Sequence, residues 1–213
     1  MVLATFDVSN VTSIPVQPIT PSNFAPYGEV MSGEHQILQD HISANYGTAI
    51  KMLNVTQSID NYNDCPSGEK SKPNWNIFRC SNPKHLIEID GNTSSYLAKV
   101  LERHPFTTQT FVPMGQLSSK LSYIVIVAET DTTTTQNLPD PASIRAFIVK
   151  GNQAVTYGAG TWHAPMVVID DQIPFIDFAV FQYANGVPDE DCQECYFEPG
   201  YSIKYRVNIE SKL

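Results

Sequence analysis

The chain has 213 residues and a formal net charge of −9 at pH 7, and 42% of its residues are hydrophobic. This acidic balance excludes nucleic acid as a partner, because phosphate binding needs a basic face. The length is typical of one or two domains, and no shift in composition marks a linker. We therefore expect a single domain over residues 1–213, with an N-terminal arm over about residues 1–20 and an acidic C-terminal tail over about residues 186–213.

The first third of the chain predicts little regular structure beyond its N-terminal segments. Thr20 or Ser22 can cap one helical turn that ends before Gly28. Residues 31–64 are polar and show no sustained period, so we expect a loop there with one strand near residues 46–55.

Short strands at close spacing are predicted over the rest of the chain, and the clearest buried one is LSYIVIVA at residues 121–128. The others are expected at residues 2–6, 14–19, 75–80, 96–101, 107–111, 144–149, 153–157, 165–169, 175–183 and 201–209. Many short strands with Gly and Pro turns, and no long amphipathic helix, are typical of an antiparallel jelly-roll barrel. We therefore predict an all-β, mainly antiparallel fold with a few short helices.

The cysteines and the N-terminus carry no strong signal. Cys192 and Cys195 form one C-x-x-C without a second pair, so reduced thiols are expected rather than a zinc ribbon. The first residues lack the basic and apolar regions of a secretory signal. No run approaches 18 apolar residues, so we expect no membrane-spanning helix and no membrane partner.

The last three residues are more informative. Ser211, Lys212 and Leu213 form the S-K-L tripeptide that the peroxisomal import receptor reads. The sequence thus predicts this receptor as a partner and a peroxisomal location, with a cytoplasmic location otherwise.

A glycine turn at residues 154–169 brings together residues that could carry chemistry. Gly158 and Gly160 separate a short strand from Trp162 and His163, the order expected for a strand, a tight turn and a second strand. His163 would begin the second strand and face whatever the first strand faces. It could equally be a hydrogen-bonded core histidine at a hairpin.

Two uses are open for Glu102, His104, Gln109 and His163. Barrels of this type that hold a metal usually supply histidines and a carboxylate from two separate motifs, so a metal site on His104, Gln109 and His163 is possible. Gln109 is a weak ligand where a carboxylate is expected. The alternative is acid–base chemistry, with His104 or His163 within reach of a substrate proton and Glu102 orienting one of them.

Two arginines and three aromatic residues complete the candidates. Arg79 and Arg145 lie on β-like stretches and could each grip a substrate carboxylate, although a salt bridge at the barrel rim explains either one equally well. The aromatic residues are core residues or line a small polar pocket, and they are Phe111, Tyr157 and Trp162.

Four motifs in one order resemble the ureidoglycolate lyase family over roughly residues 20–183. They are ITPSNFAPYGEV, NWNIFRC, ERHPFTTQTFVPM and SIRAFIVKGNQAVTYGAGTWHAPM. The resemblance implies a cupin-like barrel, a homodimer, and an enzyme that splits ureidoglycolate into glyoxylate and urea in allantoin and purine degradation. It places His104, Gln109, Tyr157, Trp162 and His163 in the pocket, with Arg79 and Arg145 as anion contacts.

The resemblance also implies a mechanism. One histidine, His104 or His163, would take the hydroxyl proton of the substrate while the other, or a water, protonates the leaving urea. No cofactor is required in this interpretation, although a divalent metal is possible. Two other functions remain open: a metal-dependent isomerase or epimerase of small hydroxy or keto acids, and a barrel that binds a small molecule without catalysis.

Overall fold

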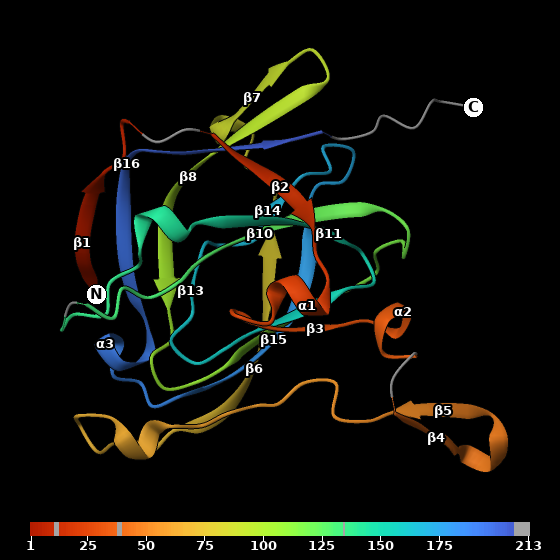
Figure 1. Ribbon diagram of the computed structural model, residues 1–213. Helices are drawn as coiled ribbons and strands as arrows, with labels where there is room; N and C mark the ends of the chain where they lie inside the picture. Colours follow the sequence, from red (N-terminus) through yellow and green to blue (C-terminus); the bar gives the residue numbers. More distant parts are fainter. Residues whose placement is uncertain (11–12, 38–39, 134, 207–213) are drawn as a thin grey trace.

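Two β-sheets contain most of the strands in the computed structural model, which describes residues 1–10, 13–37, 40–133 and 135–206 (Figure 1). The larger sheet has nine strands: β1 (Val2–Asp7), β2 (Ile14–Pro18), β7 (Ile87–Asp90), β8 (Thr93–Arg103), β10 (Leu121–Ala128), β11 (Arg145–Lys150), β13 (Trp162–His163), β14 (Val167–Val168) and β16 (Gln193–Tyr205). The smaller sheet runs in the order β3 (Gly28–Met31), β12 (Ala154–Tyr157), β9 (Gln109–Pro113), β15 (Ile176–Ala184) and β6 (Lys72–Cys80).

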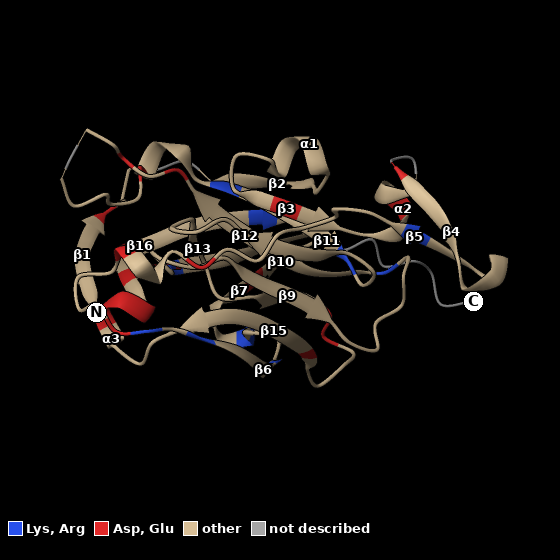
Figure 2. Ribbon diagram, turned by 90° about the horizontal axis from the view of Figure 1, so that it is seen from below, with Lys and Arg blue, Asp and Glu red and all other residues tan. Residues whose placement is uncertain are grey.

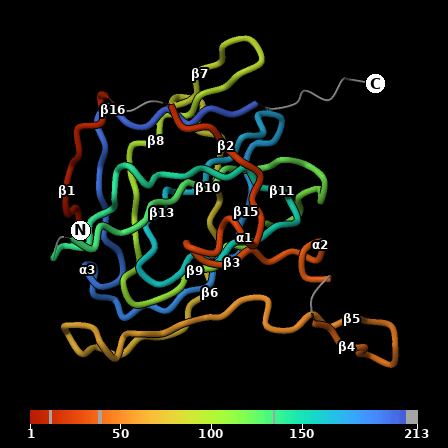
Figure 3. The backbone as a smooth tube through the Cα atoms, viewed as in Figure 1, coloured from red at the N-terminus to blue at the C-terminus, as the bar shows by residue number. Residues whose placement is uncertain are grey.

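The remaining elements are short. The helices are α1 (Pro21–Phe24), α2 (Gly33–Gln36) and α3 (Pro188–Asp191), and four 3₁₀ turns span Asn45–Gly47, Tyr62–Asp64, Lys84–Leu86 and Pro141–Ser143. The hairpin of β4 (His41–Ala44) and β5 (Ala49–Met52) projects from the body (Figure 3). No helix in the described ranges combines the length and apolar character needed to cross a membrane. The prediction of an all-β, mainly antiparallel fold with a few short helices is confirmed.

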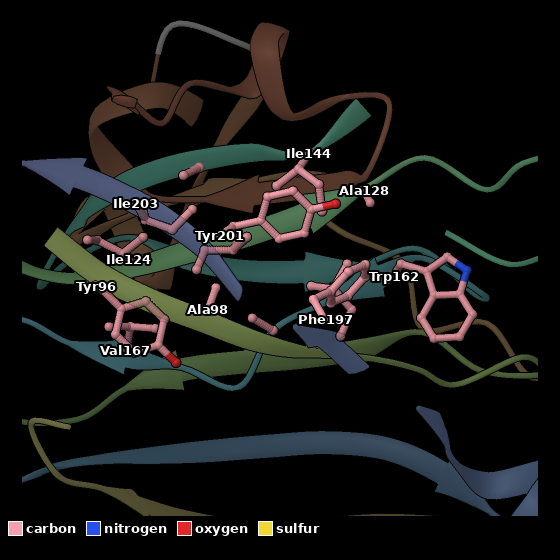
Figure 4. Packing of buried hydrophobic residues seen from close by; sticks show 14 of the residues in the cluster. Tyr96, Ala98, Ile124, Ala128, Ile144, Trp162, Val167, Phe197, Tyr201 and Ile203 are labelled. Atoms are coloured by element: carbon pink, nitrogen blue, oxygen red, sulfur yellow. The ribbon is translucent and has the colours of Figure 1, made fainter. Parts of the chain in front are cut away.

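The larger sheet closes on itself. Its strands follow the order β16, β2, β11, β10, β13 and β8, and β8 then pairs with β16 to complete the ring. Apolar side chains from these strands fill the interior, among them Tyr96, Ile124, Trp162 and Ile203 (Figure 4). The smaller sheet packs on the outside of this barrel, so that a second core forms between the two sheets.

Strand β10 explains why there are two cores. Its alternate residues Ile124, Ile126 and Ala128 enter the barrel, whereas Tyr123, Val125 and Val127 face the smaller sheet. Successive strand side chains point to opposite faces, and both faces of β10 are covered. This accounts for the unbroken apolar run predicted as a buried strand.

The predicted terminal segments are integral parts of the barrel. Strand β1 pairs in parallel with β16, and β2 pairs in parallel with β11 and β16. The segment expected as an acidic tail instead forms α3 and β16, the longest strand, because Cys195, Phe197, Tyr201 and Ile203 turn their side chains into the barrel core. The acidic residues that suggested a tail lie mainly on α3, beside the N-terminus (Figure 2). Ser211, Lys212 and Leu213 lie outside the described residues.

The predicted helical turn after Thr20 is present as α1. The Thr20 hydroxyl accepts a hydrogen bond from the Asn23 amide at 3.2 Å, and the Asn23 side chain accepts one from the Thr20 amide at 2.8 Å. This reciprocal capping satisfies two main-chain donors at the start of the turn. It anchors α1 over the second core, where Phe24 is fully buried.

Candidate active site

The candidate active site lies between the two sheets, at the C-terminal end of β8 and close to α3 (Figure 1). Strand β13 has only two residues, and they face opposite ways: Trp162 enters the barrel core, whereas His163 faces the gap between the sheets. Glu102 of β8 is directly opposite His163 in the strand register. His104 follows β8 immediately, and its ring centroid is 5.4 Å from that of His163.

The turn that carries His163 differs from the predicted hairpin. Strand β12 belongs to the smaller sheet and β13 to the barrel, so the turn crosses from one layer to the other. Gly160 has φ +78, a left-handed conformation that favours glycine, and its amide donates to the His104 carbonyl at 2.8 Å. The turn therefore holds both histidines, and His163 does face the last residue of the first strand, Tyr157.

His104 presents a free nitrogen to the site. Its Nδ1–H donates to the Asp191 carbonyl at 2.7 Å, which leaves the lone pair on Nε2. That Nε2 is buried and has no hydrogen-bond partner among the described residues. Burial lowers the pKa of His104, and the positive charge of His163 lowers it further. His104 is therefore held as a neutral imidazole that can accept a proton.

His163 is fixed on three sides. Its Nδ1–H donates to the Thr161 carbonyl at 2.9 Å, and its ring stacks on that of Tyr157. Its Nε2 lies 3.1 Å from Gln109 Oε1 and 3.5 Å from a Glu102 carboxylate oxygen. Because both of these neighbours are acceptors, the arrangement fits a proton on Nε2.

The amide of Gln109 is itself oriented by a neighbour. Its Nε2 donates to Gln182 Oε1 at 2.6 Å, so its oxygen is the atom that faces His163. Gln109 is 2% exposed, and its partner Gln182 is an uncharged carboxamide. Gln182 was not among the predicted site residues, because only the strand register places it beside Gln109.

Glu102 supplies the negative charge of the site. Burial raises the pKa of its carboxyl, but the hydrogen bond from His163 and the positive charge of that ring outweigh burial, and the net pKa is lowered. The Cys192 thiol donates to the other carboxylate oxygen at 3.9 Å. Sequence reasoning missed Cys192 and Asp191, because it placed both in an acidic tail.

The structure does not bring Arg79 to the histidines. Its guanidinium makes two hydrogen bonds of 2.9 Å with the Asp177 carboxylate and stacks on Phe175 at 3.8 Å. Arg79 and Asp177 are directly opposite on β6 and β15 and point away from the second core. The structure thus shows the salt bridge, which was one of the two uses predicted for Arg79.

Arg145 and Trp162 also lie apart from the two imidazoles. Arg145 is exposed, two strands from His163, and donates to the Ile144 carbonyl at 2.9 Å. Trp162 is fully buried in the barrel, where it packs under the Arg103 guanidinium. Trp162 therefore packs on the face of β13 opposite to His163 and does not line the pocket. Phe111 belongs to the second core, which confirms its reading as a core residue.

The same groups could hold a metal ion. Ligand atoms of Glu102, His104 and His163 all lie within 4.8 Å of one another. Each histidine donates its Nδ1–H to a main-chain carbonyl, the support that metal-ligating histidines usually have. The partnerless His104 Nε2 fits this use. Gln109 of the predicted set also lies beside His163, and Glu102 is a further candidate ligand that the predicted set did not include.

Known proteins resemble this chain over most of its length. The model of the ureidoglycolate lyase family matches residues 11–204. The chain belongs to the ureidoglycolate lyase family. A ureidoglycolate lyase of Saccharomyces cerevisiae is 40% identical over 200 residues, which cover 89% of this chain and 97% of the relative. One of Schizosaccharomyces pombe is 41% identical over 83% of this chain and 87% of the relative, and one of Brucella anthropi is 27% identical over 78% and 82%.

Proposed function

We propose that this protein is a carbon–nitrogen lyase that splits ureidoglycolate into glyoxylate and urea. Family membership supports the substrate, and one observation supports the chemistry: a buried, proton-free His104 Nε2 lies near a His163 whose Nε2 faces the acceptor oxygens of Gln109 and Glu102. The two histidines thus offer a base and an acid to one small molecule between the sheets.

The reaction needs one proton to move from oxygen to nitrogen. Ureidoglycolate carries a hydroxyl, a carboxylate and a ureido nitrogen on one carbon. His104 Nε2 takes the hydroxyl proton, the C–O bond becomes the aldehyde carbonyl of glyoxylate, and the C–N bond breaks. His163 gives its Nε2 proton to the departing nitrogen, which leaves as urea. No water is consumed, so the step is an elimination and its atoms balance.

Glu102 and Tyr157 prepare His163 for this role. The Glu102 carboxylate stabilises a positive charge on the ring, and it stays ionised because its pKa is lowered. Tyr157 holds the ring by stacking. Its hydroxyl is fully buried, and burial raises its pKa well above the ordinary value, so it does not act as a base.

We propose that cofactor-free catalysis is the working mode and that Glu102, His104 and His163 are the ligands if a divalent metal binds. A metal there would supply Lewis acidity toward the substrate hydroxyl. The same residues would suit the alternative of a metal-dependent isomerase or epimerase of small hydroxy or keto acids.

The cellular setting is a further part of the proposal. We propose a role in allantoin and purine degradation, and import into peroxisomes through Ser211, Lys212 and Leu213, since the S-K-L tripeptide is a targeting signal that the import receptor binds.

We also propose a homodimer. The exposed apolar side chains of Trp75 and Ile77 on β6, 66% and 69% exposed, support a protein interface.

The deciding experiment is glyoxylate release from ureidoglycolate by the purified protein, with and without a chelator. We expect activity that the chelator does not change. Activity that is lost to the chelator and restored by a divalent metal would keep the lyase and make the histidines ligands. Binding of glyoxylate without turnover of ureidoglycolate would contradict the lyase and favour a binding barrel.

A further inference from the structure

A row of three carboxamides crosses the smaller sheet beside the histidines. Gln109 of β9, Gln182 of β15 and Asn74 of β6 are directly opposite one another in the strand register. They share the sheet face of Phe111 and Val180, which line the second core between the sheets. Gln109 contacts His163, whereas Gln182 and Asn74 have no role in the proton transfers proposed for the two histidines.

The row leads from the buried site toward solvent. Gln109 is buried and contacts His163, whereas Gln182 and Asn74 are half-buried. Asn74 lines an open cavity of about 590 Å³ together with Lys72, Ala184 and Asn185. The inner end of the row is therefore at the proposed acid, and its outer end is at the wall of a space large enough for a small molecule.

We propose that the side chains of Gln109, Gln182 and Asn74 form the subsite for the ureido group of the substrate. The inference rests on the proposed function and adds the residues that recognise the leaving group. A ureido group is planar and neutral, with one carbonyl acceptor and several N–H donors. Carboxamides match it because each offers a carbonyl acceptor and two N–H donors without a net charge.

The position of the row agrees with the direction of the reaction. His163 Nε2, whose proton goes to the departing nitrogen, is 3.1 Å from the Gln109 oxygen. A ureido nitrogen at this proton leaves the rest of the group to extend along the sheet toward Gln182 and Asn74. Urea would then leave through the cavity that Asn74 lines.

The test uses two inert inhibitors that differ in the ureido group. N-carbamoylglycine has the ureido group and the carboxylate, whereas glycolate has the carboxylate and hydroxyl only. In Gln182→Met, which keeps the side-chain length, and in Asn74→Ala, we expect N-carbamoylglycine to bind roughly three- to tenfold more weakly, the effect of one lost hydrogen bond. Glycolate binding should not change. Asn76→Ala, two residues along the same strand, is the control and should leave both constants unchanged.

Binding is measured by calorimetry as well as by inhibition, so the result does not depend on turnover, and thermal unfolding checks that each variant is folded. Unchanged N-carbamoylglycine binding in both variants, or equal weakening of both inhibitors, would overturn the subsite. If the wild-type protein does not split ureidoglycolate but binds N-carbamoylglycine through Gln182, the proposed function fails and the subsite stands.

Discussion

The imidazole of His163 lies flat against the phenol ring of Tyr157, with ring centroids 3.9 Å apart and planes inclined by 14°. The two residues come from different sheets and are joined by the glycine turn. The contact fixes one face of the His163 ring, and both rings are buried. The Tyr157 ring is thus a flat platform that positions His163 and is not itself a reacting group.

The platform predicts different effects for two Tyr157 variants. Tyr157→Phe keeps the ring and removes a hydroxyl that donates a hydrogen bond to the Met166 sulfur at 4.0 Å, so we expect kcat within about threefold of wild type. Tyr157→Leu removes the flat surface, and we expect kcat to fall at least about tenfold, along with a loss of about 2–4 kcal/mol in the free energy of unfolding. Steady-state kinetics and denaturant unfolding measure both. Equal kcat in the two variants would contradict the platform.

Replacing either histidine should slow catalysis without much effect on substrate binding. Replacing His104 or His163 with Asn removes the proposed base or acid, and each change should lower kcat by about 10²–10⁴-fold with a much smaller change in KM. His85 is the matched control, because it lies on a separate 3₁₀ turn, and His85→Asn should leave both constants unchanged. Wild-type activity in both site variants would rule out the acid–base roles.

Arg79 should contribute little to substrate binding. Its guanidinium is paired with Asp177 on a largely exposed surface, where a salt bridge contributes about 0–1 kcal/mol. We expect Arg79→Gln to leave KM for ureidoglycolate unchanged and to shift stability by less than about 1 kcal/mol. The parallel variant Arg145→Gln tests the remaining predicted anion contact. A rise in KM that occurs for Arg79→Gln would show that its side chain leaves Asp177 when substrate binds.

Local patterns in the sequence predicted the strands better than their partners. Strand β10 matches its predicted bounds because an unbroken apolar run needs burial on both faces. The histidines were found because they stand beside glycines and prolines in recognisable motifs. The terminal strands were missed as parts of the barrel, because their pairing is set by residues more than a hundred positions away.

The misplaced residues share that cause. Alternation alone places Arg79 on one face of β6 without saying which face covers the core, and that is decided by the register with β15, where Phe78 is opposite the buried Phe178. Gln182 and Asp191 were not candidates at all. One acts through a cross-strand neighbour and the other through a main-chain carbonyl, and neither contact leaves a trace in residue type or spacing.

The helix that orients His104 should make stability depend on pH. Glu190 of α3 is next to Asp191, whose carbonyl holds His104. Burial raises the pKa of its carboxyl, but hydrogen bonds from the Ser67 hydroxyl and amide and from the Asn185 side chain lower it from 4.5 to about 2. A carboxyl whose folded-state pKa is depressed stabilises the fold above its unfolded pKa, and this stabilisation is lost as the pH falls through the folded pKa.

We therefore expect wild type to exceed Glu190→Gln in Tm above about pH 5, and the difference to shrink between about pH 4.5 and 2. Asp189→Asn is the control, since Asp189 is exposed on the same helix and 3.7 Å from the N-terminal amine. Thermal unfolding from pH 2 to 7 gives both curves. A constant difference between wild type and Glu190→Gln across this range would mean that the ionised carboxylate is not what fixes α3. Because α3 orients His104, the same variant should lower kcat even at pH 7, where the fold itself is intact.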